Sequence, residues 1–278
     1  MINKDRLKRR FSRNAKQYDK HARVQKVMGD ILIENIKRDG KYFKNILEIG
    51  CGTGYVTKAL VKYFPGAQIT GIDIAPGMIE HISSTLQDEN VKFICGDIEE
   101  MTLSEKYDLV ISNATFQWFN HLDKTLDKIV RSLNPNGILC FSTFGEKTFY
   151  ELHRTFDKAG EILKINEEVS PGQSFYSLNE LEGICRNIAV KEGRKAMEIC
   201  SFQTYELEYF NSCKDFLYSI KKIGANNSES NRNRIVPDFI EKVMEIYDKD
   251  YLEDNKVRAT YHNLFIYMKS NLRGLPNR

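Results

Sequence analysis

The stretch "LEIGCGTGYVT" (residues 47–57) joins an apolar run to a helical pattern through a loop that contains three glycines. The run "NILEIG" (45–50) is typical of a buried strand, and "YVTKALVKYF" (55–64) is typical of a helix. Glycine permits positive φ angles and lets a ligand approach the bare backbone. The stretch therefore predicts a strand–loop–helix unit whose loop binds a ligand.

The same alternation of strand and helix patterns continues on the carboxyl side of this loop. Further strands are predicted at 67–73, 91–97, 107–113 and 138–144, with helices at 76–87 and 121–133 and a turn, "NPNG", at 134–137. Strands that alternate with helices form βαβ units with right-handed crossovers. The first half of the chain is therefore expected to form a parallel α/β sheet of five strands.

The second half is less regular and adds two more strands. They are predicted at 195–209 and 260–269, and residues 177–187 resemble a Ser-capped helix. Residues 5–38 predict one helix. The division expected from these patterns is an N-terminal lid helix (1–40), a core (41–144), an insertion (145–176), more core (177–210), a helical lid insertion (211–252), and a final core strand with a tail (253–278). Both insertions are expected at the carboxyl ends of the strands, where open α/β sheets bind ligands.

Composition excludes several classes of protein. The 278 residues suffice for one large α/β domain with insertions, and no apolar run approaches the ~18 residues of a transmembrane helix. No apolar segment follows the basic start, as a secretory signal would require. The six cysteines are scattered and form no zinc-binding pattern, so we expect reduced buried thiols in a cytoplasmic protein without a bound metal.

Charge is distributed unevenly along the chain. Residues 1–26 contain ten Lys or Arg and two Asp, so they carry +8, and the net charge of +3 leaves −5 for the rest. The segment "LKRRFSRNAKQYDKHARVQ" (7–25) is compatible with a targeting peptide, a nucleic-acid-binding arm, a membrane-surface helix or part of an active site. An anionic partner or ligand is expected at this end of the chain.

The pattern E-x-G-x-G-x-G in the glycine loop resembles motif I of the class I S-adenosylmethionine-dependent methyltransferases. The G-x-G-x-x-G loop of dinucleotide-binding proteins fits less well, because Tyr55 stands in place of its last glycine. The resemblance implies a Rossmann-like fold in which Asp73 binds the ribose hydroxyls and Asp97 the adenine amino group. The cofactor-binding residues that it implies are Glu48, Gly50, Gly52, Gly54, Asp73, Ile74, Asp97, Ile98 and Asn113, the last beside the reacting methyl group.

The segment after the fourth strand narrows the class of methyltransferase. "SNATFQWF" (112–119) stands where amino-methylating enzymes of nucleic-acid bases have N-P-P-[YF], and no cysteine pair is placed for attack on cytosine. Phe116, Trp118 and Phe119 are candidates for the wall of a substrate pocket. The alternative for them is ordinary packing.

Longer segments resemble the malonyl-[acyl-carrier-protein] O-methyltransferases of biotin synthesis. They are "RRFSRNAKQYDKHARVQ", "SNATFQW", "TFGEKTFYELH", "SIKKIGANNSESNR" and "TYHNLFIYMK", which together span nearly the whole chain. The resemblance implies methyl transfer from S-adenosylmethionine to the free carboxylate of malonyl-acyl carrier protein, which masks the charge for chain elongation. The lysine-rich "GEKTFYEL" departs from the family, so we assign Lys147 no catalytic role.

The resemblance also implies roles for individual residues. Tyr18 is expected over the methionine end of the cofactor, where it closes the site and acts in catalysis. Substrate contacts are expected from Trp118 and from a cation, with Arg13, Arg232 and His262 as alternatives that the sequence does not separate. The N-terminal helix is then a lid whose Lys8, Arg9 and Arg10 face outward and attract the acidic carrier protein, with no role for nucleic acid or membrane.

Three rival interpretations remain at this point. A small-molecule carboxyl methyltransferase, such as one acting on trans-aconitate, has a similar N-terminal pattern. An RNA-directed methyltransferase would use the basic arm on phosphates, although the rest of the chain is acidic. The third interpretation takes the N-terminal segment as a mitochondrial presequence, whose cleavage would remove part of the expected site.

Overall fold

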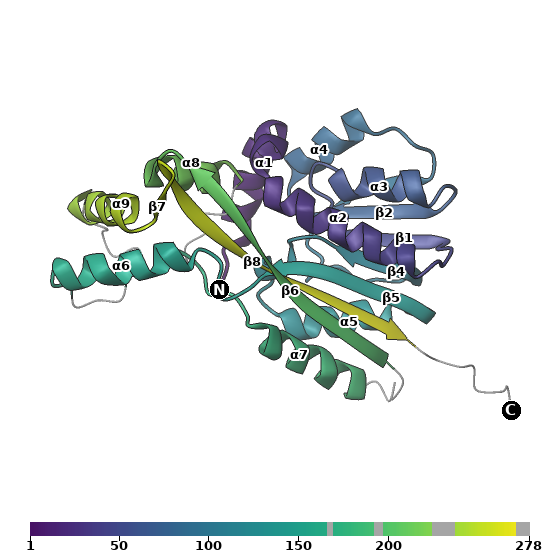
Figure 1. Ribbon diagram of the computed structural model, residues 1–278. Helices are drawn as coiled ribbons and strands as arrows, with labels where there is room; N and C mark the ends of the chain where they lie inside the picture. Colours follow the sequence, from purple (N-terminus) through teal and green to yellow (C-terminus); the bar gives the residue numbers. More distant parts are fainter. Residues whose placement is uncertain (166–168, 192–196, 224–236, 271–278) are drawn as a thin grey trace, which may run out of the picture.

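The computed structural model describes residues 1–165, 169–191, 197–223 and 237–270, and a single mixed sheet organises them (Figure 1). The helices are α1 (Lys4–His21), α2 (Arg23–Arg38), α3 (Tyr55–Tyr63), α4 (Pro76–Thr85), α5 (Leu122–Arg131), α6 (Tyr150–Ile162), α7 (Leu178–Lys191), α8 (Cys213–Lys222) and α9 (Pro237–Asp250), with a short 3₁₀ helix, η1 (Phe116–Trp118). The strands are β1 (Asn45–Ile49), β2 (Gln68–Asp73), β3 (Val91–Cys95), β4 (Tyr107–Ser112), β5 (Leu133–Phe144), β6 (Met197–Phe210), β7 (Leu252–Glu253) and β8 (Lys256–Ser270).

The strand order in the sheet is β3-β2-β1-β4-β5-β8-β6. Neighbours from β3 to β5 are parallel, and β8 runs antiparallel between β5 and β6. This confirms the mostly parallel seven-stranded sheet predicted from the sequence. The two-residue strand β7, which pairs with β8, was not predicted.

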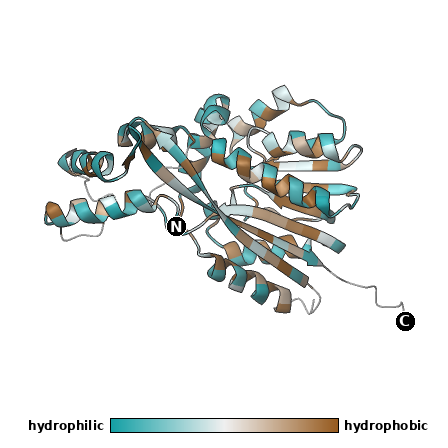
Figure 2. Cartoon of the chain, in the orientation of Figure 1, coloured by the Kyte–Doolittle hydropathy of each residue, from teal (hydrophilic) through white to brown (hydrophobic). Residues whose placement is uncertain are grey.

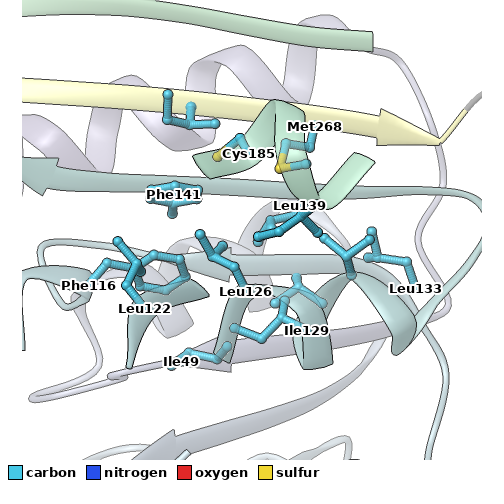
Figure 3. Close-up of a cluster of buried hydrophobic side chains, with 14 of the residues drawn as sticks. Ile49, Phe116, Leu122, Leu126, Ile129, Leu133, Leu139, Phe141, Cys185 and Met268 are labelled. Carbon is cyan, nitrogen blue, oxygen red and sulfur yellow. The ribbon is translucent and has the colours of Figure 1, made fainter. Parts of the chain in front are cut away.

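Each face of the sheet is covered by helices because neighbouring residues of a strand point to opposite sides. On β1, Ile46 packs in the cluster under α2 and α3, whereas Leu47 packs in the cluster under α5 and α7. Figure 3 shows the second cluster, in which Leu126 and Ile129 of α5 lie against Leu139 of β5. In Figure 2 the central strands are mainly apolar, as expected for strands buried on both faces.

The two insertions form a separate layer of helices beyond the sheet. The helices α6, α8 and α9 share a hydrophobic cluster with Val257 and Ala259 of β8 (Figure 1). The first insertion follows the carboxyl end of β5 and the second follows that of β6. Among the helices of the described ranges, none is long and apolar enough to cross a membrane.

Two local predictions were wrong. The helix predicted over 5–38 is broken at Ala22, where φ is −96° and ψ is 40°. Ala22 is buried, and the break lets α2 cover the sheet while α1 packs against α4 and α8, so tertiary contacts impose it without a Gly or Pro. The turn predicted at 134–137 lies inside β5, where a shift of register against β4 and a positive φ at Asn136 accommodate it.

Candidate functional site

The glycine loop turns sharply between β1 and α3. Gly50 and Cys51 both donate backbone hydrogen bonds to the carbonyl of Ile72, at 2.7 and 3.1 Å. Gly50 has a φ of 73°, and a Cβ there would lie 2.1 Å from Oγ1 of Thr115. Only glycine fits, because any larger residue would combine strained backbone with this contact. The loop therefore exposes backbone at the carboxyl ends of β1 and β2.

A hollow of about 650 Å³, part of it open to solvent, adjoins this loop; we call it the glycine-loop hollow. Its walls come from α1, from the glycine loop and from the carboxyl ends of β2, β3 and β4. Predicted cofactor residues that line it are Tyr18, Gly50, Gly52, Asp73, Ile74, Asp97, Ile98 and Asn113. The structure thus brings together side chains that the sequence separates by up to 95 positions.

Asp73 connects the glycine loop to the end of β2. Its Oδ2 accepts the N–H of Gly52 at 2.9 Å, and its Oδ1 accepts the N–H of Ala75 at 2.8 Å. Burial raises the pKa of the carboxyl to about 6, against the effect of these two hydrogen bonds. At neutral pH the group is a partly buried anion that holds the loop and has lone pairs left for donors of a ligand.

The N-terminal segment also lines the hollow through Lys4, a residue to which the sequence analysis assigned no role. Lys4 forms ion pairs with Asp97 at 3.4 Å and with Glu99 at 2.5 Å, and it lines the hollow. Ile2 exchanges hydrogen bonds with Asn120 at 2.6 and 3.1 Å. Within a segment of ten basic residues, nothing in the sequence distinguishes Lys4 from the others.

The remaining motif residues, Glu48 and Gly54, do not line the glycine-loop hollow. Glu48 lies in a neighbouring hollow with Asp19 and Thr53, and its Oε2 accepts the hydroxyl of Thr57 at 2.6 Å. Gly54 has a φ of 84°, and a Cβ there would lie 1.9 Å from Ile82. A glycine here is therefore explained by the positive φ and by the close approach of Ile82 of α4.

The raised pKa of Glu48 predicts that the unfolding free energy of the protein depends on pH. Burial raises its pKa from 4.5 to about 8, with a hydrogen bond from Thr57 opposing and the charge of Asp73 adding to the shift. The folded state thus binds a proton more tightly than the unfolded state, so the stabilisation is complete below pH 4.5 and is lost as the pH rises to about 8. In Glu48→Gln the amide can still accept from Thr57, and we expect this variant to exceed the wild type in unfolding free energy by about 2–4 kcal/mol at pH 8 and by less than about 1 kcal/mol at pH 5.

Urea unfolding at pH 5, 6.5 and 8 measures this effect. Glu241→Gln, at an exposed position on α9, is the matched control and should follow the wild type at each pH. A constant difference between Glu48→Gln and the wild type across these pH values would contradict the predicted proton binding.

Aromatic side chains of α1 and η1 form another part of the wall of the glycine-loop hollow. The ring of Phe11 lies 6.2 Å from that of Tyr18 and 5.8 Å, edge-on, from that of Trp118. Burial and the charge of Asp73 raise the pKa of Tyr18, so its hydroxyl stays protonated.

Asn113 donates to the carbonyl of Gln25 at 2.8 Å and accepts from Ser142 at 2.7 Å. Both ends of its amide are therefore held by the protein.

Beyond Trp118 lies a second, more apolar space of about 720 Å³, part of it open to solvent, which we call the aromatic hollow. Its lining residues are Trp118, Phe144, Phe149, Leu152, His153, Pro171, Gly172, Gln173, Phe175, Leu217, Ile220, Ile223 and Tyr261. Trp118 lines both hollows and so forms the boundary between them. Phe119 lines the glycine-loop hollow, whereas Phe116 is core and stacks on Phe141 at 4.2 Å.

The three candidate cations lie outside both hollows or outside the described ranges. Arg13 is exposed on α1 and lines neither hollow. His262 is buried in β8, with Nε2 2.8 Å from Gln203 and Nδ1 accepting the N–H of Lys147 at 3.3 Å. Burial, together with the charge of Lys147, lowers its pKa to about 4, so it is neutral at pH 7 and does not provide the expected positive charge. Arg232 lies outside the described residues.

Comparisons with the sequences of known proteins identify the family of the chain. Residues 47–141 match a family described as a methyltransferase domain. A malonyl-[acyl-carrier protein] O-methyltransferase of Acetivibrio thermocellus is 47% identical and covers 100% of this chain and 98% of its own. The enzymes of the same name from Priestia megaterium (44% identity, 98% and 100% coverage) and Bacillus anthracis (42%, 96% and 98%) are similar too.

Solved structures share the fold at low sequence identity. The YcgJ protein of Bacillus subtilis has a TM-score of 0.59 at 15% identity and covers 87% of this chain and 98% of its own. The plantazolicin methyltransferase BpumL, in complex with a substrate analogue and SAH, has a TM-score of 0.51 at 16% identity and covers 95% and 90%. These likenesses confirm the class I methyltransferase fold.

Proposed function

Since the chain belongs to the malonyl-[acyl-carrier protein] O-methyltransferase family, we propose that it methylates the free carboxylate of malonyl-acyl carrier protein. It is an S-adenosylmethionine-dependent carboxyl O-methyltransferase. The ester would prime the pimeloyl chain in biotin synthesis, in the cytoplasm. The observation that carries the proposal is the convergence of the glycine loop, Asp73 and Asp97 on one hollow that adjoins an apolar one.

The glycine-loop hollow fits the cofactor. Asp73 offers a partly buried carboxylate for ribose hydroxyls, and Asp97 with the backbone of Ile98 offers an acceptor and a donor for adenine. Gly50 and Gly52 let the cofactor pack on the backbone, while Tyr18 and Asn113 lie near the reacting end. Glu48 and Gly54 would support the loop from outside this hollow. When bound, S-adenosylmethionine supplies a methyl group on a positively charged sulfur.

The chain's own residues need to align the substrate with the methyl group and to exclude water from the site. They do not need to move a proton. A malonyl carboxyl has a pKa near ~4 and is already ionised at neutral pH, so no catalytic base is required. Phe11, Tyr18 and Trp118 would exclude water from the line of attack, and alignment can contribute about 7–11 kcal/mol. Tyr18 thus acts by closing the site, with its hydroxyl protonated.

A cation for the substrate carboxylate is still required. Among the described residues that line the two hollows, the potential cations are Lys4, which is paired with two acids, and His153, whose pKa burial lowers. Arg232 therefore remains our candidate, because a guanidinium matches a carboxylate in shape. The helices of the two insertions, with α1, would form the lid.

Mass spectrometry of malonyl-acyl carrier protein after incubation with enzyme and S-adenosylmethionine tests the function. We expect one added methyl group on malonyl-carrier and none on acetyl-carrier, because acetyl has no free carboxylate. Malonyl-coenzyme A and trans-aconitate run in parallel. Methylation of trans-aconitate but not of malonyl-carrier would leave the cofactor assignment and overturn the substrate.

The basic arm is proposed as the docking surface for the acidic carrier. Arg9 is exposed on α1, Lys8 and Arg10 are partly exposed, and Arg13 adds to this surface. Reversal of Lys8, Arg9 and Arg10 to Glu is expected to raise KM for malonyl-carrier about tenfold at low salt and less at high salt, since opposite charges steer association. Reversal of the exposed Lys58, Lys62 and Lys92 is the control. An unchanged KM for the carrier would contradict the docking role.

A further inference from the structure

The helix α8 has an apolar inner face and a polar outer face. Leu217, Ile220 and Ile223, at its carboxyl end, help to line the aromatic hollow. On the outer face, the side chain of Tyr218 is 55% exposed. A single exposed aromatic side chain is common on protein surfaces. Its neighbours therefore decide whether it belongs to a binding surface.

Cations surround Tyr218 on this face. Residues three or four positions apart are neighbours on a helix, so Lys214, Lys221 and Lys222 lie around the tyrosine, together with one acid, Asp215. Nζ of Lys222 lies 5.0 Å from the centre of the ring. Within the described part of the chain, no ion pair joins any of these lysines to an acid. Their charge is therefore available to a partner.

The outer face of α8 adjoins the basic helix α1. Nδ2 of Asn14 donates to the backbone carbonyl of Lys221 at 3.3 Å, and the two helices pack together (Figure 1). Arg13, next to Asn14, is exposed. The basic surface of α1 thus continues onto a helix about 200 positions later in the chain, and that helix adds an exposed aromatic side chain, which α1 does not have.

The shape and chemistry of this surface favour a protein as the partner. Tyr218 and the three lysines line neither the glycine-loop hollow nor the aromatic hollow, so a small anion would not be enclosed there. In protein interfaces, tyrosine is enriched among the residues that contribute most to binding, and charged side chains lie at the rim. A partner that covers an exposed tyrosine surrounded by lysines is itself acidic.

Resting on the proposed function, we propose that the outer face of α8 binds the protein part of the acyl carrier, with Tyr218 as the central contact and the three lysines paired with its acids. A specific interface takes about 800 Å² from each partner, more than one helix face offers, so α1 and α8 together form the docking surface. A carrier on α8 is separated from the aromatic hollow by one helix diameter, about 10 Å.

Replacing Tyr218 with serine tests the central contact. We expect KM for malonyl-carrier to rise about tenfold with kcat unchanged, because the residue acts in binding and lies outside both hollows. The rise should persist at high salt, since salt screens charges and not apolar contacts. Tyr63→Ser is the matched control. Tyr63 is also exposed and has lysine side chains over its ring, but it lies at the end of α3 away from the glycine loop.

The charges of the face can be tested in both directions. Changing Lys214, Lys221 and Lys222 together to Gln is expected to raise KM for malonyl-carrier about tenfold at low salt and less at high salt. Asp215→Asn is expected to lower KM about twofold, because it removes a charge of the same sign as the carrier's. A gain in affinity cannot arise from damage to the fold.

Calorimetry with S-adenosylmethionine should give the wild-type Kd for every variant, which shows that the cofactor site is intact. An unchanged KM in both Tyr218→Ser and the triple lysine variant would overturn the inference. If the triple variant at the same time lost retention of single-stranded RNA, the face would belong to nucleic acid instead. Failure of the wild type to methylate malonyl-carrier would overturn the proposed function. Fluorescence anisotropy of labelled carrier would then still test docking, and equal affinity of the wild type and the triple variant would refute it.

Discussion

Replacing Asp73 with alanine is expected to weaken binding of S-adenosylmethionine by about 100-fold or more. The variant loses the acceptor for the N–H groups of Gly52 and Ala75, which are then left unpaired beside the hollow. Each such loss costs about 1–3 kcal/mol, and a factor of 100 corresponds to about 2.8 kcal/mol. The proposed contact with the ribose hydroxyls disappears at the same time.

Titration calorimetry with S-adenosylmethionine measures this loss. The pKa of about 6 adds a second signature: wild-type affinity should fall below pH 6, where the carboxyl is protonated, and the variant should lack this dependence. Asp123→Ala, an exposed acid on the first turn of α5, serves as the control. Undiminished affinity in a folded Asp73→Ala protein would show that the cofactor binds elsewhere.

Replacing Gly50 with alanine is expected to destabilise the fold by about 2–5 kcal/mol and to abolish measurable cofactor binding. A residue with a Cβ costs about 1–2 kcal/mol at positive φ, and overpacking adds about 1–3 kcal/mol. Here the new methyl group would meet the whole side chain of Thr115, whose Oγ1, Cγ2 and Cβ all lie within 2.9 Å. The loop must move to relieve this contact, and the surface for the cofactor moves with it.

The variant Gly40→Ala separates the cost of a positive φ from the cost of overpacking. Gly40 also has a positive φ, 65°, but a Cβ there would have no atom within 4 Å. Urea unfolding should therefore show a loss of about 1–2 kcal/mol for Gly40→Ala and a clearly larger one for Gly50→Ala. Equal losses would mean that Thr115 gives way easily and that the contact carries little cost.

The glycine loop and the sheet edge beside it were predictable because they depend on local patterns. The strand–loop–helix at the glycine loop and the acids after β2 and β3 follow from spacing along the chain. Parallel strands bring their carboxyl ends to one edge, so Asp73 and Asp97 were expected to lie close together before the structure was known. The glycine-loop hollow contains both.

The substrate side was less predictable because it is built by contacts between distant segments. No helix-breaking residue in the sequence marks the break at Ala22. The break nevertheless places α1 beside the hollow and Lys4 within ion-pair distance of Asp97. The sequence likewise offered His262 as a cation, whereas burial between strands makes it neutral.

The sequence by itself thus determined the class of fold, the glycine loop and the family, since these are encoded by residue type at short or regular spacing. Only the tertiary structure decided which polar groups are left without partners. The oxygen of Gln173 has no partner among the described residues, because Gln117, 56 positions away, holds the nitrogen of the same amide. Such a property belongs to the burial and pairing of two segments, and no pattern within either one encodes it.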